Sequence, residues 1–402
     1  MSPPRTLSPA ATATPVRVII TGEYPPQPGG VSAYTRRVAE GLAAAGEQVH
    51  VLAPACGGPS TGDGVATVHR LPGTFGAHAL QAMAQVLEAL PERRRILVQW
   101  VPHAFGWRAM NLPLCAWLAT RPEPLDVMFH EVAYPWRPSA KALVLASAHR
   151  VMAGLISLGA DRAYTSTPAW EPLLRRVGLR GELQWLPVPS NLPERADPEA
   201  VARVRCRLSS GDVTRFVGHF GTHGEPIAPL VAHALPAVLR ARGDAAALLV
   251  GRGSQACRDR LAAAHPALAT RLAATGELTD EEAAAHLAAC DVLVQPYPDG
   301  ATTRRGSLMA GLALGRAIVT NDGPLTEPFW RGSAAVALAR DPGAIAAIAA
   351  ELLGDASRSS ALGSHGAALY RERFALGRTI AALHATWATA PTPLSARGGS
   401  LA

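Results

Sequence analysis

The sequence predicts an α/β protein with two doubly wound domains of similar size, each a parallel sheet covered by helices. Short apolar runs alternate with helical patterns, and the runs at 16–20 and 48–54 flank a helical pattern that starts after Gly30. The alternation breaks at a polar, proline-containing stretch, "SNLPERADPEA", and then starts again. A length of 402 residues with 48% hydrophobic residues is sufficient for two cores.

The first domain is expected over residues 16–189. Its strands are marked by runs of β-branched and other apolar residues, which are typical of strands buried on both faces. They are expected at 16–20, 48–54, 95–101, 125–130, 162–167 and 183–189. The segment 141–160 is long and apolar, but His149 and Arg150 interrupt it, so we expect a buried helix and not a membrane span.

A linker is expected at 190–211, and the second domain at 212–375. The strands of this domain are expected at 215–221, 246–253, 274–278, 291–297, 316–322 and 334–338. A C-terminal helix is expected at 376–387, and the composition predicts a disordered N-terminus at 1–15 and a flexible tail at 388–402. Because ligands of doubly wound sheets bind beyond the carboxyl ends of the strands, a cleft between the two domains is the expected site.

Charge and cysteine content narrow the function only in part. The formal charge of +7 comes almost entirely from arginine, with Lys141 as the single lysine. This excess fits a phosphate-bearing substrate, nucleic acid or an anionic membrane surface, and a general arginine bias explains it equally well. The five cysteines are widely spaced without a CxxC pair, which argues against disulfides and a zinc site. We expect a cytoplasmic protein without a nucleic-acid partner, with at most a weak peripheral association at the inner face of the membrane.

A glycine pair in the second domain resembles part of a dinucleotide-binding motif. Gly251 and Gly253 follow an apolar run, but the third motif position is Ala256 and no acidic residue ends a second strand at the expected distance. We therefore expect a tight strand-to-helix turn, and no cofactor.

A second glycine pair, Gly29 and Gly30, lies directly before a helix in "EYPPQPGGVSAY". Backbone without side chains can approach a ligand closely, and the start of a helix offers unpaired N–H groups with partial positive charge. A flexible loop would explain the same residues, but this loop is long and stiffened by proline. We favour a ligand-binding role.

His130 and Glu131 follow a strand in "LDVMFHEVAYPW". A histidine at this position can donate a hydrogen bond to a sugar hydroxyl or act as an acid or base. A partly buried loop histidine with a structural role is an equally good interpretation.

The segment "PYPDGATTRRGSLMAGLALGRAIVT" places a polar cluster before an apolar helix. The cluster consists of Asp299, Gly300, Thr302, Thr303, Arg304, Arg305, Gly306 and Ser307. A diphosphate prefers N–H donors at a helix start and the planar fork of arginine. We favour a diphosphate site over a capped helix with solvated arginines. Because two adjacent arginines should not both face one way, we expect at least one to be solvent-exposed or structural.

From residue 16 to about residue 387, the chain resembles the retaining GT-B glycosyltransferases of family four. The similarity rests on the opening "YPPQPGGVSAYTRRVAEGLAAAGEQVHVLAP", on "VGHFG" with "LLVGRG", on "TGELTDEEAAAHLAACDVLVQPYPDG", and on "LALGRAIVT". It implies two Rossmann-like domains facing across a cleft, a nucleotide-sugar donor held mainly by the second domain, and an acceptor held mainly by the first.

The resemblance also implies residue roles. Gly29 and Gly30 would approach the donor phosphates, and His130 would match the histidine that contacts the transferred sugar. The reaction would retain the anomeric configuration without a metal, in keeping with the lack of an Asp-x-Asp pair. Arg304 and Arg305 would offset the diphosphate charge together with backbone amides.

This sequence departs from the family pattern at the donor site. The family has two glutamates eight positions apart; Asp299 can stand for the first, but the second falls on Ser307 or on Ala310, depending on how the alignment is counted. The basic pair of the first C-terminal loop is also missing. The loop "GHFGTHG" offers His219 and His223 instead, and Gly221, His223 and Arg252 are further donor-side candidates.

Two functions from different classes remain open, with a third less favoured. The first is a glycosyltransferase with His130 and Asp299 in the catalytic site and an unidentified acceptor. The second is a non-catalytic GT-B-like protein that binds a nucleotide or glycan within a biosynthetic complex, as the missing glutamates would allow. A GT-B sugar epimerase is less favoured because its acidic and basic groups cannot be placed.

Overall fold

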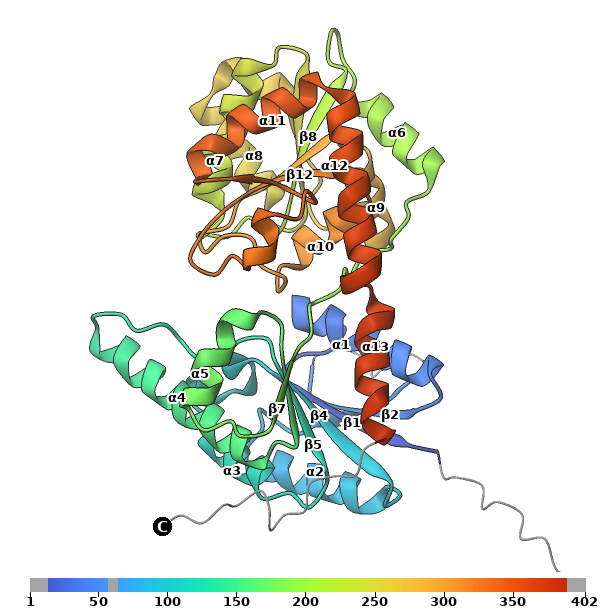
Figure 1. Cartoon of the computed structure of the whole chain (residues 1–402), viewed down its shortest axis with the longest axis vertical. Coiled ribbons are helices and arrows are strands. Elements are labelled where there is room, and N and C mark those ends of the chain that lie inside the picture. Colours follow the sequence, from blue (N-terminus) through green and yellow to red (C-terminus); the bar gives the residue numbers. More distant parts are fainter. Residues whose placement is uncertain (1–13, 57–63, 389–402) are drawn as a thin grey trace, which may run out of the picture. The chain divides into compact units, whose positions relative to one another are not determined.

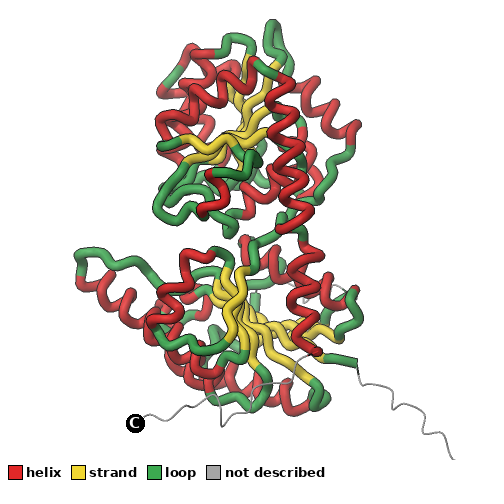
Figure 2. The backbone as a smooth tube through the Cα atoms, in the orientation of Figure 1, coloured by secondary structure: helices red, strands yellow, loops and turns green. Residues whose placement is uncertain are grey.

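The computed structural model describes residues 14–56 and 64–388, and the chain forms two compact units. The first unit comprises Met1–Thr165, Trp170–Trp185 and Ile380–Ala402, as far as these are described; the second comprises Ser166–Ala169 and Leu186–Thr379. Figure 2 shows a central layer of strands with helices around it in each unit. The expected disorder at 1–15 and 388–402 falls almost entirely outside the described residues.

The first unit contains a seven-stranded parallel sheet in the order β3-β2-β1-β4-β5-β6-β7 (Figure 1). Its strands are β1 (Val16–Thr21), β2 (Gln48–Pro54), β3 (Thr67–Leu71), β4 (Arg94–Trp100), β5 (Leu125–Phe129), β6 (Arg162–Thr165) and β7 (Glu182–Trp185). Its helices are α1 (Gly30–Ala44), α2 (Ala77–Ala89), α3 (Leu112–Ala119), α4 (Ala140–Gly159) and α5 (Glu171–Arg176). The alternation of strand and helix predicted this doubly wound architecture.

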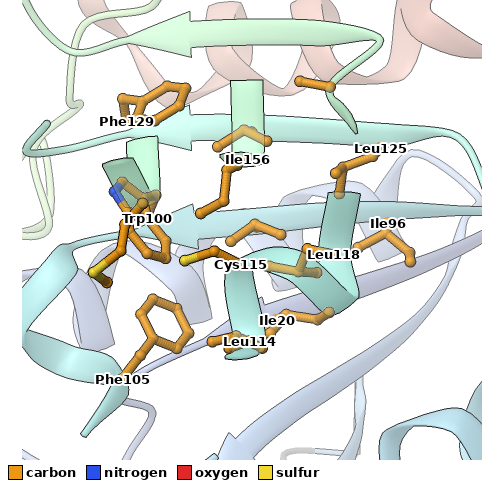
Figure 3. Close-up of a cluster of buried hydrophobic side chains, with 14 of the residues drawn as sticks. Ile20, Ile96, Trp100, Phe105, Leu114, Cys115, Leu118, Leu125, Phe129 and Ile156 are labelled. Carbon is orange, nitrogen blue, oxygen red and sulfur yellow. The ribbon is translucent and has the colours of Figure 1, made fainter. Parts of the chain in front are cut away.

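The main core cluster of the first unit lies between the sheet and the helices α2, α3, α4 and α5. Figure 3 shows part of it, with Trp100 at the end of β4 beside Phe105 and Cys115. The rings of Trp100 and Phe105 stack with centroids 5.2 Å apart. All three side chains are fully buried, so this cluster fixes the carboxyl end of β4, next to the candidate site.

The end of the chain belongs to the first unit. Helix α13 (Leu376–His384) leads into it, and the fully buried Arg17 of β1 donates hydrogen bonds to the Leu383 carbonyl at 3.0 Å and Thr386 Oγ1 at 3.2 Å. The same guanidinium pairs with Glu47 at 2.9 Å and Asp126 at 3.1 Å. A buried cation needs such partners, so the last described residues help to complete the first unit.

The second unit contains a six-stranded parallel sheet in the order β10-β9-β8-β11-β12-β13. Its strands are β8 (Arg215–Phe220), β9 (Ala245–Val250), β10 (Leu272–Ala274), β11 (Val292–Gln295), β12 (Ala317–Asn321) and β13 (Ala337–Ala339). Its helices are α6 (Pro198–Leu208), α7 (Ala228–Ala241), α8 (Ser254–Ala264), α9 (Asp280–Ala288), α10 (Gly306–Ala313), α11 (Ile345–Gly354) and α12 (Ala356–Leu369).

The domain boundaries differ from the sequence-based ones. The expected linker at 190–211 contains α6, and the second unit already begins at Leu186. Asp197 caps α6 by accepting hydrogen bonds from the Glu199 and Ala200 N–H groups, and Pro198 occupies its first turn. These are ordinary helix-start signals, which the polar composition of the stretch concealed.

Helix α4 corrects a second expectation, since it is buried on one side only. Ala142, His149 and Ala153 lie on its buried side, whereas Val144 and Val151 are more than half exposed. The sequence did not distinguish the two sides because both are apolar. Strand β3 was also missed: it is a short edge strand whose side chains are mostly half-exposed.

Candidate functional site

Both sheets reverse their strand order at one point. In the first unit the reversal lies between β1 and β4, and in the second between β8 and β11. Ligands of doubly wound folds bind at such points, outside the carboxyl ends of the strands. The loops after β1, β5, β8, β9 and β11 carry the residues that the sequence singled out.

The loop after β11 brings one carboxylate and two guanidinium groups together. Both Arg304 and Arg305 pair with Asp299, each with a different carboxylate oxygen. Burial would raise the pKa of Asp299, but the two arginines hold it below its ordinary value. The expectation that adjacent arginines should not face one way is therefore wrong here. The turn closed by the Arg305 N–H and the Thr302 carbonyl lets both side chains reach back to Asp299.

Helix α10 begins directly after these arginines, with Arg305 as its N-cap and no side chain capping it. The Ser307 hydroxyl is 2.8 Å from the Tyr297 hydroxyl, and the Arg305 guanidinium lies over the Tyr297 ring, 4.8 Å from its centroid. The start of a helix and two arginines are thus combined in one loop, an arrangement suited to an anion such as a diphosphate.

Glu327 fixes this loop, and no sequence pattern pointed to this residue. Its carboxylate accepts hydrogen bonds from the Thr303 N–H at 3.0 Å and from Trp330 Nε1–H at 2.8 Å, and it is 3% exposed. Asn321 acts similarly on Tyr297, accepting from its N–H and donating to its carbonyl. Glu327 is 24 residues from Thr303 in sequence and lies in "TEPFW", which resembles an ordinary surface loop.

Gly300 is required by the close approach of two loops. Its φ is +87°, and a Cβ here would lie 2.5 Å from the Gly323 backbone nitrogen and would overlap the Thr326 side chain. Only glycine fits this conformation and this space. The Asp-Gly turn predicted from sequence therefore also sets the position of the Asp299 carboxylate.

The other donor-side candidates lie together at the ends of β8 and β9. His219 donates from Nδ1 to the Val294 carbonyl at 2.8 Å, and its ring stands edge-on to that of His223, 5.0 Å away. Burial lowers the pKa of both rings, for His219 to about 3, and the nearby backbone of Arg252 and Gly221 opposes the shift at His223. These histidines are neutral at pH 7, so they do not replace the positive charge of the missing basic pair.

The Gly251-x-Gly253 pair has a structural explanation. Both glycines have positive φ, +108° and +80°. A Cβ at Gly251 would lie 2.5 Å from the Gly221 carbonyl oxygen, and one at Gly253 would lie 2.8 Å from that of Thr222. The pair lets the loops after β8 and β9 touch, which agrees with the tight turn predicted from the sequence.

In the first unit, the start of α1 already holds an anionic group. Glu23 Oε1 accepts a hydrogen bond from the Ser32 N–H at 3.0 Å, and a Cβ at Gly29 would overlap the Glu23 carboxylate. A Cβ at Gly30 would meet no atom within 4 Å. The site predicted at Gly29 and Gly30 thus has the N–H donors of a helix start, with a carboxylate of the chain bound to one of them.

His130 lies at the end of β5, among buried polar groups from β4 and α1. Its Nε2 is 2.8 Å from Gln99 Oε1, and the Tyr34 ring stands edge-on to it at 4.8 Å. The side chain is 8% exposed, and burial lowers its pKa to about 3. It is therefore a neutral imidazole at pH 7. The neighbouring Glu131 is paired with His103; its Oε2 lies 3.5 Å from Nδ1 of His103.

Within residues 14–56 and 64–388, no group of three or more His, Cys, Asp or Glu side chains is arranged to hold a metal ion.

Two family models match the chain, one in each half. "Glycosyltransferase Family 4" matches residues 28–183, and "Glycosyl transferases group 1" matches residues 212–355. No curated protein matches the sequence.

Solved structures share the fold over nearly the whole chain. Sucrose-phosphate synthase from Thermosynechococcus elongatus is 20% identical, with a TM-score of 0.70 over 92% of this chain and 98% of that one. HepE of Anabaena, solved with UDP and glucose, is 18% identical, with a TM-score of 0.68 over 93% and 99%. A glycosyltransferase from Rickettsia africae is 11% identical, with a TM-score of 0.67 over 93% and 98%.

Proposed function

The chain is a glycosyltransferase of the GT-B fold, and from this we propose that it transfers a sugar from a nucleotide-diphosphate donor to an acceptor hydroxyl, with retained anomeric configuration and without a metal. The observation that carries the proposal is the loop after β11. There Arg304 and Arg305 share one carboxylate at the uncapped start of α10.

The charge of this loop suits a donor diphosphate. The two guanidinium groups and the ionised Asp299 together carry a net charge of +1. This positive charge attracts the negatively charged diphosphate. As the bond from the anomeric carbon to the diphosphate oxygen breaks, negative charge grows on the leaving group. Arginines and helix N–H groups held in place beforehand stabilise that charge without reorganising.

No protein nucleophile is needed for this reaction. The acceptor hydroxyl oxygen forms the new bond to the anomeric carbon from the face that the diphosphate leaves, and its proton passes to the departing phosphate oxygen. His130 takes the role of a neutral hydrogen-bonding group that orients the transferred sugar. Since its pKa is lowered to about 3, it does not act as an acid or base near pH 7.

The donor is tested first with the ligands of a similar structure. HepE of Anabaena was solved with UDP and with UDP-glucose, so calorimetric titration of the full chain with UDP, UDP-glucose and GDP comes first. We expect one nucleoside diphosphate to bind with the affinity of its sugar conjugate or more tightly. Absence of binding to any nucleoside diphosphate would contradict the donor assignment. The anomer of the released or transferred sugar, followed by NMR, then tests retention.

A non-catalytic nucleotide-binding protein is the second candidate, favoured by one observation. Asp299, which can stand for the first donor-site glutamate, is engaged by both arginines, and the two candidates for the second, Ser307 and Ala310, are not acidic. Prolonged incubation with the donor that binds separates the two functions. Slow hydrolysis of the donor to free sugar supports the transferase, whereas binding without any hydrolysis or transfer supports the second candidate.

A further inference from the structure

The exposed large hydrophobic side chains of the described residues are concentrated in one part of the first unit. All but one lie between residues 107 and 158: Trp107, Leu112, Trp136, Leu143, Val144, Val151 and Leu158. The exception is Val65. Figure 1 shows α4 and the loop before it at the margin of this unit. Scattered exposed apolar residues are ordinary, but a concentration on one element calls for a partner.

Helix α4 carries most of this surface along one side. Val144, Val151 and Leu158 are spaced seven residues apart, so they project from the same side of the helix, and Leu143 adjoins Val144. These four side chains are between 46% and 59% exposed. Trp136, 55% exposed, is connected to the helix by the Arg150 guanidinium, which lies 4.2 Å from its ring centroid. We call Trp136, Leu143, Val144, Val151 and Leu158 the α4 surface.

The charges along this segment are of one sign. No Asp or Glu occurs between residues 132 and 160, whereas Arg137, Lys141 and Arg150 do. The acidic residues on neighbouring segments are engaged elsewhere. Glu131 pairs with His103 and Glu171 with Arg175, and Asp161 accepts a hydrogen bond from the Leu125 N–H. The α4 surface is thus apolar, bears a tryptophan and is bordered by cations.

We propose that the α4 surface docks the protein onto an anionic lipid membrane, with α4 lying in the plane of the interface. Apolar side chains on one side, cations beside them and an exposed tryptophan are the features of such helices. This contact differs from a purely electrostatic attachment, because part of its binding free energy comes from inserted apolar side chains. It is independent of the proposed diphosphate-binding loop after β11, which lies on the second unit.

The helix lies on the membrane and does not cross it. It is long and apolar enough for a span, at 20 residues with a mean hydropathy of 1.5, but 44% of that window is buried in the protein. At its end, a Cβ on Gly159 would lie 2.6 Å from the Ala119 Cα, so α4 packs tightly on α3. Leaving this position would expose the core around Met152 and Ile156, whose side chains are fully buried.

Vesicle flotation of the full chain tests the proposal. The vesicles consist of phosphatidylcholine alone or of phosphatidylcholine mixed with phosphatidylglycerol. The variant Val144→Glu/Val151→Glu places two carboxylates on the α4 surface, and Val65→Glu makes the same change at the exposed valine outside it. Glutamate has a higher helix propensity than valine, so the double variant should fold, which its melting temperature checks.

We expect the wild type to float with the anionic vesicles and to remain partly bound in high salt, because apolar contact is not screened by ions. The double variant should partition roughly tenfold or more weakly, from the lost apolar burial alone, while Val65→Glu behaves as the wild type. Arg137→Gln/Lys141→Gln should weaken binding mainly at low salt.

Three results would overturn the proposal. The wild type could bind neither kind of vesicle, or the double variant could bind as tightly as the wild type. The third result would be that the α4 surface binds a second copy of the chain. Light scattering without lipid would then show a dimer of the wild type but not of the double variant, and neither protein would float with vesicles. In that case the α4 surface would be an interface between copies.

Discussion

At the scale of single residues, the proposed donor site contains two arginine side chains that share one partner, Asp299. Arg304→Gln and Arg305→Gln each remove one guanidinium from the loop after β11. A charge-assisted hydrogen bond contributes about 1.5–3 kcal/mol, so at least one variant should bind the nucleoside diphosphate roughly tenfold or more weakly. Calorimetry measures this, with Arg207→Gln on the exposed part of α6 as the matched control. Equal affinities in all three variants would remove the arginines from the donor site.

His130 offers a test that separates catalysis from packing. Its hydrogen bond with Gln99 and its contact with Tyr34 mean that His130→Ala should lower the melting temperature. If it also orients the sugar, kcat per folded molecule should fall strongly while affinity for the free nucleotide stays nearly unchanged. His149→Ala is the control, since His149 is also buried in the first unit but belongs to the buried side of α4. Similar kcat in both variants would make His130 purely structural.

The position of His130 could be predicted, but its environment could not. The order of residues along the chain places it at a strand end, where doubly wound sheets bind ligands. Gln99 lies 31 residues away in sequence and Tyr34 much further, so no local pattern contains them. The same holds for Glu327. Because the contacts that set burial and pKa are long-range, the sequence predicted which residues are candidates but not their protonation state.

At the scale of elements, the loop between β11 and α10 depends on Gly300. Gly300→Ala would force a side chain into the left-handed region and against the Gly323 backbone. Left-handed backbone costs a non-glycine residue about 1–2 kcal/mol before any clash, so we expect a lower melting temperature and weaker nucleotide binding together. Gly243→Ala, where a Cβ meets no atom within 4 Å, should change neither. Loss of stability with unchanged nucleotide affinity would separate this loop from the donor site.

Whether a segment forms a strand or a helix was predictable where the spacing of its apolar residues was unambiguous. The buried strands β1, β4 and β5 follow from runs that only a doubly covered sheet accommodates. Strand β3 and helix α6 were missed because a half-exposed edge strand and a polar helix resemble loops in composition. Helix α4 was predicted as a helix, but an apolar sequence does not show which side has no partner.

At the scale of the whole molecule, the fold could be predicted and the boundaries could not. Alternating strands and helices predict two parallel sheets, but the return of residues from Ile380 onward to the first unit leaves no trace in local pattern. It depends on the contacts of Arg17, more than 360 residues earlier in the chain.

We predict that the transfer activity of the full chain does not require a metal ion. Activity should survive excess EDTA, because arginines and helix N–H groups are proposed to offset the diphosphate charge that Mg²⁺ or Mn²⁺ offsets elsewhere. The assay compares initial rates with EDTA, without it, and with added Mg²⁺ or Mn²⁺. A complete loss that either ion restores would contradict the arginine-based account.

Acid should destabilise both units. Burial lowers the pKa of His130 and His219 to about 3, whereas the unfolded chain titrates near 6.5. Between these values the unfolded state binds protons that the folded state excludes, so stability is complete above about pH 6.5 and falls as the pH drops toward 3. Each histidine should cost roughly 2 kcal/mol between pH 7 and pH 5.

Urea unfolding at these two pH values measures the effect. His219→Gln, which removes one of the two titrating groups, should reduce the difference in unfolding free energy. Equal stability of the wild type at both pH values would mean that these rings accept protons within the fold.

The return of the chain to its first unit has a consequence for synthesis. A ribosome delivers β1 more than 360 residues before Leu383 and Thr386, yet the buried guanidinium of Arg17 contacts both of these residues. In the nascent first unit the guanidinium of Arg17 therefore lacks two of its hydrogen-bond partners until the second unit has been translated. The first unit, which begins to be made before the second, can therefore complete its buried contacts only after the second has been synthesised.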